Sequence, residues 1–81
     1  MTDLIEMLAK NIVDDPKSVK TSLESIEGRQ VVKLIVNQGD MGKIIGKGGK
    51  VIRAIRNLLR IRAASENKRV YLELVNQDQN A

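Results

Sequence analysis

Apolar and polar positions repeat with two different periods along this chain, and the changes of period mark its elements. Between residues 4 and 14 apolar side chains recur every three or four positions, which predicts an amphipathic helix. Asp3 and Glu6 have the spacing of a capping box at the start of this helix. Asp15 precedes Pro16 and therefore favours extended geometry, so we expect the helix to end near Asp14.

The next two segments, 18–26 and 30–37, alternate with a period of two and predict a β-hairpin around a Glu27-Gly28-Arg29 turn. Ile26 breaks the alternation, so we expect a bulge or strand end near Ser25. The remaining elements are a short helix over 41–45 capped by Asp40, a helix over 50–64 and a strand over 69–76.

The predicted order of helix, strand, strand, helix, helix and strand indicates an α+β fold, with a three-stranded mixed sheet and three helices on one face. We assign a single domain to residues 1–76 and a polar tail to residues 77–81. The residues expected in the core are Leu4, Leu8, Ile12, Val32, Leu34, Val36, Ile52, Ile55, Leu59, Val70, Leu72 and Leu74.

The amino-acid composition excludes several kinds of chemistry but says little about the fold. The chain has 81 residues without cysteine, histidine or tryptophan, which excludes disulfides, Cys/His metal sites and imidazole catalysis. Only Asp40 and Glu66 supply carboxylates near the glycine-rich segment, so we expect neither an enzyme nor a cofactor. The absence of cysteine favours a cytoplasmic location. Because no apolar stretch approaches the roughly 20 residues that span a bilayer, we expect no membrane partner.

Positive charge is concentrated in one third of the chain. Residues 43–69 hold nine basic residues against one acidic residue, a balance of +8, whereas residues 1–42 and 70–81 each have a balance of −2. Such a segment is typical of a surface that binds a polyanion. A solvated basic helix face is the alternative that charge alone leaves open.

The sequence Gly46-Lys47-Gly48-Gly49 separates the two predicted helices of this basic segment. Glycines free the backbone for positive φ, and the following helix begins with unpaired N–H groups that suit a phosphate flanked by Lys43, Lys47 and Lys50. The spacing matches neither a Walker A loop nor a dinucleotide-binding fingerprint. The alternative is a flexible linker between two helices.

The run Ile-Ile-Gly-Lys-Gly-Gly-Lys-Val-Ile-Arg-Ala-Ile over residues 44–55 resembles the KH-domain signature, with Gly46 and Gly49 as its fixed glycines. The element order is similar to that of type II KH domains. A free-standing domain of this length resembles the KhpA (YlqC) family of small bacterial single-KH-domain RNA-binding proteins.

This resemblance implies that the loop clamps about four nucleotides of single-stranded RNA beside an apolar groove. It also implies a post-transcriptional regulator or RNA chaperone that bears on cell shape, with a KhpB (Jag)-like multidomain KH protein as a possible partner. Arg53 and Arg56 are expected to add a smaller, salt-dependent contribution. The candidate RNA-binding residues are Lys43, Ile44, Ile45, Gly46, Lys47, Gly48, Gly49, Lys50, Ile52, Arg53 and Arg56.

A KH-fold module that acts mainly through dimerisation with a partner protein is the alternative function. The apolar arc of the helix over 50–64 spans roughly 200°, more than one sheet requires. We therefore expect a homodimer or heterodimer through Ala54, Leu58 and Ile61. Cover by the first helix is the competing explanation for this flank, and Tyr71 with Val75 forms a second candidate patch.

Overall fold

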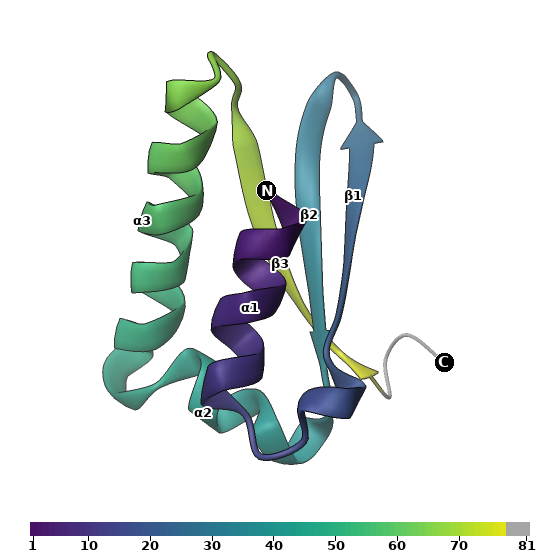
Figure 1. Ribbon diagram of the computed structural model, residues 1–81, viewed down its shortest axis with the longest axis vertical. Helices are drawn as coiled ribbons and strands as arrows, with labels where there is room; N and C mark the ends of the chain where they lie inside the picture. Colours follow the sequence, from purple (N-terminus) through teal and green to yellow (C-terminus); the bar gives the residue numbers. More distant parts are fainter. Residues whose placement is uncertain (78–81) are drawn as a thin grey trace.

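Three helices cover one face of a three-stranded sheet in the computed structural model, which describes residues 1–77 (Figure 1). The α+β class and the element order agree with the prediction. Gln77 is the one described residue of the predicted tail, and residues 78–81 lie outside the described part. The helices and strands are α1 (Thr2–Ile12), β1 (Lys20–Ile26), β2 (Arg29–Val36), α2 (Met41–Ile45), α3 (Lys50–Ser65) and β3 (Val70–Asn76), with 3-10 turns at Pro16–Ser18, Gln38–Asp40 and Lys47–Gly49.

The sheet has the order β1-β2-β3 and is mixed, because β1 runs antiparallel to β2 whereas β3 runs parallel to it. Glu27 and Gly28 turn the hairpin with φ values of 52° and 79°. Positive φ at both central residues is the geometry of a type I′ turn. Of the two alternatives expected near Ser25, the structure shows a strand end and not a bulge, because pairing continues without interruption until β1 ends at Ile26, opposite Arg29.

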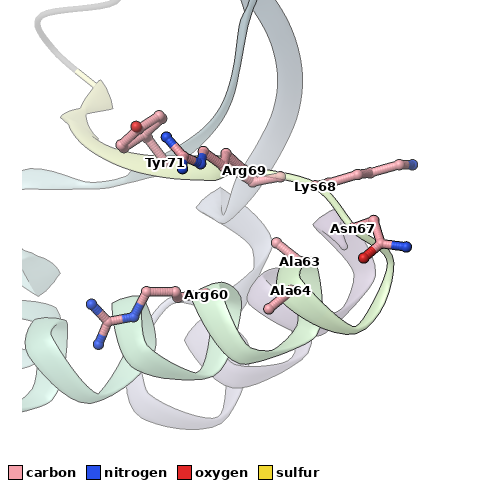
Figure 2. A pocket seen from close by; sticks show the side chains of 8 residues that line it. Arg60, Ala63, Ala64, Asn67, Lys68, Arg69 and Tyr71 are labelled. Carbon is pink, nitrogen blue, oxygen red and sulfur yellow. The ribbon is translucent and has the colours of Figure 1, made fainter.

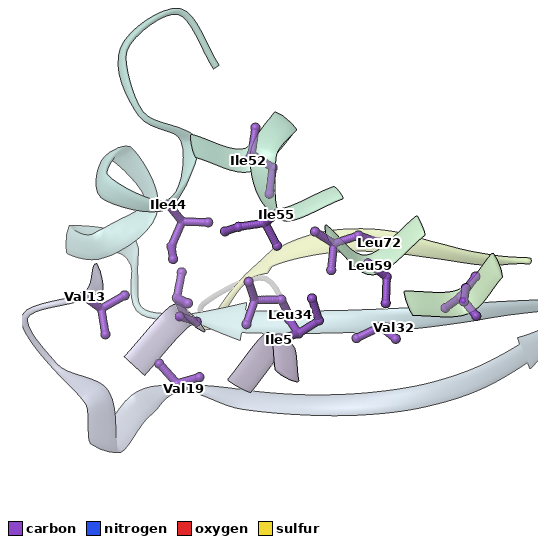
Figure 3. Close-up of a cluster of buried hydrophobic side chains, with 14 residues drawn as sticks. Ile5, Val13, Val19, Val32, Leu34, Ile44, Ile52, Ile55, Leu59 and Leu72 are labelled. Carbon is purple, nitrogen blue, oxygen red and sulfur yellow. The ribbon is translucent and has the colours of Figure 1, made fainter. Parts of the chain in front are cut away.

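The core lies between the helices and one face of the sheet (Figure 3). Eight of the predicted core residues on β2, β3 and α3 are buried, and Leu74 is half-buried against them. Ile35 on the opposite face is only 9 % exposed, but it does not belong to this cluster. The strand faces are therefore as predicted. The buried cluster consists of Ile5, Ala9, Val13, Val19, Val32, Leu34, Val36, Ile44, Ile52, Ile55, Leu59, Ala63, Val70 and Leu72.

The buried face of helix α1 is shifted by one residue from the predicted face. Ile5, Ala9 and Val13 are buried, whereas the predicted core residues Leu4, Leu8 and Ile12 are half-buried. Each buried position is adjacent to a predicted one, and the small, fully buried Ala9 lets the helix pack closely on the core. The predicted cap at Asp3 is also wrong, because the helix begins at Thr2 after Met1 and holds Asp3 in its first turn.

Asp40 joins the end of α1 to the start of α2. Its buried carboxylate accepts hydrogen bonds from the backbone N–H groups of Asp14 and Asp15, each at 3.1 Å. The predicted side-chain cap of α2 is therefore wrong, since both oxygens of Asp40 accept hydrogen bonds from the segment that follows α1 instead. The side chain of Asn37 in turn accepts the Asp40 N–H at 3.0 Å. This network holds α2 in place, and with it the loop that follows.

Candidate nucleic-acid interface

The glycine loop (residues 46–49) connects α2 to α3. Gly46 has φ 74° and ψ 170°, a backbone region that essentially only glycine adopts. A Cβ atom at Gly46 would lie 2.8 Å from Cβ and 2.9 Å from the backbone nitrogen of Val51. Glycine is thus required here for two independent reasons, its dihedral angles and the close approach of α3.

Gly48 and Gly49 continue the loop with φ values of 65° and 76°. The N–H of Gly49 donates to the carbonyl of Gly46 at 3.1 Å, which closes a tight turn. Helix α3 begins directly after Gly49 and has no side-chain cap. The N–H groups of its first turn and the positive end of its dipole therefore face the loop, where they favour an anion.

Arg53 holds the loop from the following helix. Its Nη2 donates a hydrogen bond to the carbonyl oxygen of Gly48 at 2.9 Å. The sequence placed Arg53 on the exposed side of the helix, as a source of charge alone. The structure adds a geometric role, because the contact links the tip of the loop to the first turns of α3.

The lysines around the loop are not equivalent. Lys43 Nζ contacts the carboxylate of Asp14, and this hydrogen bond raises the pKa of Lys43 above its usual value. Lys47 and Lys50 are exposed, and neither forms an ion pair with any of residues 1–77. Two of the three predicted cations are thus free to meet a phosphate, whereas the third already has a carboxylate partner.

Two of the predicted contact residues belong to the hydrophobic core. Ile44 is fully buried and Ile52 nearly so, both within the cluster beneath the helices (Figure 3). The prediction that Ile44 touches RNA is corrected, because a side chain without exposed surface cannot line a groove. Ile52 is 8 % exposed, and its contact with RNA stays a prediction. Ile45 is exposed and remains the apolar candidate beside the loop.

A groove runs from α3 to the edge strand β3. We call this cavity of about 460 Å³ the α3 groove, and it includes the predicted residues Arg53 and Arg56. Sequence reasoning missed the other lining residues, although the spacing of Asn57 and Arg60 after Arg53 puts them on one helix face. The residues that line the groove are Arg53, Arg56, Asn57, Arg60, Tyr71 and Leu72.

The lining of the α3 groove contains three arginines and no carboxylate. Glu66 is the one acidic residue between positions 43 and 69, and it is engaged at the far end of α3. It accepts a hydrogen bond from Arg62 Nε at 3.1 Å and lies 3.8 Å from Lys68 Nζ. The hydrogen bond from Arg62 lowers the pKa of Glu66, so this carboxylate is ionised at neutral pH. The positive charge of the groove itself is not neutralised.

The predicted dimer residues lie on the side of α3 away from this groove. Ala54, Leu58 and Ile61, which we call the α3 flank, are all exposed, with Leu58 at 44 % and Ile61 at 66 %. Helix α1 therefore does not cover them, and the competing explanation from the sequence is wrong.

Among the described residues, no helix has the length and apolar character needed to cross a membrane. The same part of the chain contains no group of three or more His, Cys, Asp or Glu residues that could hold a metal ion.

Comparison with known proteins agrees with the fold. The family model described as the KhpA/KhpB KH domain matches residues 2–74. The "RNA-binding protein KhpA" of Clostridium acetobutylicum is 41 % identical over 75 residues, which are 93 % of this chain and 100 % of the relative. The protein of the same name from Borreliella burgdorferi is 44 % identical over 73 residues, or 90 % of this chain and 89 % of the relative.

A solved structure of Aquifex aeolicus Era has the same fold, with a TM-score of 0.51 and 24 % sequence identity. The match covers 94 % of this chain but only 31 % of the Era chain, and it concerns the fold alone. The matches over nearly the whole length, together with the geometry of the glycine loop, show that the chain belongs to the KhpA/KhpB family of KH-domain proteins.

Proposed function

We propose that this protein binds single-stranded RNA, with the glycine loop clamping about four nucleotides by their backbone. The observation that carries the proposal is the loop itself. Its backbone requires glycine at Gly46, it opens onto the N-terminus of α3, and it presents Lys47 and Lys50 without competing carboxylates. The relatives that match most of the chain are named RNA-binding proteins, and their family is not one of enzymes.

The loop and the α3 groove contact different parts of the RNA. Phosphates meet the first-turn N–H groups of α3 and the charges of Lys47 and Lys50. The bases then enter the α3 groove, where Arg56, Asn57 and Arg60 offer hydrogen-bond donors. Tyr71 is the only aromatic residue of the chain, so base reading rests mainly on hydrogen bonds rather than on stacked rings.

The test compares the wild type with the double variant Lys47→Asp/Gly48→Asp in a fluorescence-anisotropy titration with single-stranded RNA. Two carboxylates at the tip of the loop repel phosphate, so we expect binding to fall by at least about 100-fold. The matched control Lys20→Asp/Ser25→Asp makes the same change of three charges on two exposed positions of β1. Equal weakening by the two double variants would show that net charge, not the loop, determines binding.

The apolar α3 flank supports a second proposal, that the protein forms a dimer through this surface. Leu58 and Ile61 expose apolar area that a partner would remove from water at roughly 25 cal/mol per Å². A homodimer joins two four-nucleotide sites on one RNA and gains avidity. A KhpB-like multidomain KH protein is the alternative partner, and in that case the module acts mainly through protein interaction.

The cellular role that we propose follows from the small size of the RNA site and the modest affinity expected of it. A site of about four nucleotides suits a cytoplasmic post-transcriptional regulator or RNA chaperone, which must bind many transcripts and release them. Because its affinity depends on a few phosphate contacts, binding should weaken steeply as salt rises.

A further inference from the structure

The face of the sheet opposite the three helices carries the only aromatic ring of the chain. Val70 and Leu72 on β3 are buried on the helix side, so Tyr71 between them points to the opposite, outer face. Figure 2 shows the Tyr71 ring and the side chain of Arg69 directed away from α3. Tyr71 borders the α3 groove because β3 is an edge strand, but its ring lies on the outer face, and 48 % of the residue is exposed.

Two arginines lie beside this ring at one end of the sheet. Gln30 pairs with Val70 in the parallel register, so Arg29 and Arg69, each one residue earlier, lie at the same end of neighbouring strands. The guanidinium carbon of Arg29 is 5.7 Å from the centroid of the Tyr71 ring, within the range of a cation–π contact. Neither arginine forms an ion pair within the part of the chain that the structure describes. We call these two arginines and Tyr71 the ring cluster.

The carboxylates of the outer face do not neutralise the ring cluster. Glu24 lies 3.3 Å from Lys33, and Glu73 is paired with Lys33 in the register of β2 and β3, so these three residues form a mixed patch in the middle of the face. Glu27 in the hairpin turn is two residues from Arg29. Even when Glu27 is counted with the cluster, two arginines stand against one carboxylate, and this end of the outer face remains positive.

An exposed ring between free guanidinium groups suits a single-stranded nucleic acid better than a protein partner. Bases of every type stack on aromatic rings, and guanidinium groups pair with phosphates. The core of a protein interface is depleted of charged residues, whereas Glu24, Lys33 and Glu73 lie next to the cluster on this face. A homodimer through this face would also bring two copies of the same arginines together.

We propose that the ring cluster is a second contact site for single-stranded RNA, on the face of the sheet opposite the helices. A base stacks on the Tyr71 ring, and the neighbouring phosphates pair with Arg29 and Arg69. The inference rests on the proposed RNA binding but does not require the glycine loop, because neither arginine belongs to the loop or to the α3 groove. The second site has no backbone clamp and is the weaker of the two. It allows one protein to hold two segments of RNA.

The test uses the ring of Tyr71 as its reporter. The chain has no phenylalanine, tryptophan or histidine, so the aromatic ¹H–¹³C spectrum of the ¹³C-labelled protein contains signals of Tyr71 alone. Unlabelled random-sequence RNA of eight nucleotides is added to the wild type and to Lys47→Asp/Gly48→Asp, up to about 1 mM, above the range of weak nucleic-acid contacts. Because a stacked base shields the ring protons, we expect the signals to move upfield in both proteins, with dissociation constants within about threefold of each other.

The double variant Arg29→Gln/Arg69→Gln removes the charge of the ring cluster and keeps the reporter. The dissociation constant read from the Tyr71 ring should rise about 4- to 25-fold, the loss expected for two exposed ion pairs. The control Lys17→Gln/Lys20→Gln removes the same two charges from exposed positions before and at the start of β1, and it should change this constant less than about threefold. Equal affinity in the variant and its control would overturn the second site.

The outcomes separate this inference from the proposed function. Ring signals that stay in place while the amides of residues 46–50 shift would overturn the second site and leave the loop proposal standing. No change in either set of signals would overturn both. A ring shift that disappears in Lys47→Asp/Gly48→Asp would show that the ring responds only to RNA held by the loop, which overturns an independent site. An equal response to an octaglutamate peptide would assign the cluster to an acidic protein segment instead of RNA.

Discussion

Gly46 and Gly48 both have positive φ, but their surroundings differ. A Cβ atom at Gly46 meets Val51, whereas one at Gly48 meets open space. Gly46→Ala should therefore lower the free energy of unfolding by about 3 kcal/mol and abolish RNA binding, since the loop must open. Gly48→Ala should cost only about 1 kcal/mol and retain most of the binding. Urea denaturation and RNA anisotropy measure the two effects, and equal behaviour of both variants would contradict this account of the loop.

The sequence predicts the loop glycines well because their spacing and their position between two helices are both local features. It predicts the apolar contacts poorly. Ile44 and Ile45 are adjacent isoleucines beside the same loop, yet one is buried in the core and the other is exposed. Apolar character alone marks both kinds of position, and only the packing of α2 against α1 and α3 separates them.

Asp14, which follows the end of α1, contacts Lys43 on α2, the helix before the glycine loop. The carboxylate of Asp14 pairs with the ammonium of Lys43, which then competes less well for a phosphate. Asp14→Asn should release Lys43 and strengthen RNA binding about two- to fivefold at low salt, the range measured for exposed ion pairs. The control Asp3→Asn removes the same charge from the first turn of α1. Identical gains in the two variants would assign the effect to net charge.

The raised pKa of Lys43 determines how the contact between Lys43 and Asp14 responds to pH. A lysine whose pKa is raised in the folded state stays protonated to higher pH than usual, so the contact with Asp14 persists across the neutral range. The chain has no histidine, the side chain whose charge ordinarily changes in this range. RNA affinity should therefore be constant between about pH 6 and pH 9, as a titration in matched ionic strength would show.

At the level of elements, periodicity predicted the order, the strand faces and the hairpin. The errors occurred where the pattern is ambiguous. Helix α1 contains adjacent apolar pairs such as Leu8 and Ala9, so two neighbouring stripes fit the sequence equally well. The bulge considered near Ser25 was suggested by Ile26, an exposed residue at the end of β1. Because Ile26 is exposed, its position in the alternation says nothing about the core. The role of Asp40 depends on partners about 25 residues away, which no local motif contains.

For the whole molecule, the exposed α3 flank predicts self-association. Sedimentation should show a dimer of the wild type at tens of micromolar and a folded monomer of Leu58→Asp with weaker RNA binding, because two sites no longer share one strand. Leu23→Asp is the matched control, since Leu23 on β1 is similarly exposed at 50 %. Sedimentation of the wild type as a monomer would contradict the prediction.

The distribution of charge along the sequence indicates which third of the molecule carries the proposed binding surface, but not the shape of that surface. The α3 groove exists because α3 lies beside β3, the edge strand that follows the basic segment. Asn57 and Arg60 could have been found from their helical spacing. Tyr71 and Leu72 could not, since their place opposite α3 is set by the packing of helix on sheet.

The most direct test of the central claim is an NMR titration of the ¹⁵N-labelled protein with single-stranded RNA of four nucleotides. The account predicts that the amide signals of residues 46–50 shift most, followed by those of Arg53, Arg56 and Asn57 along the α3 groove. Signals of α1 outside its last turn and of β1 should stay in place. Shifts confined to the α3 flank or to the outer face of the sheet, with the glycine loop unchanged, would contradict it.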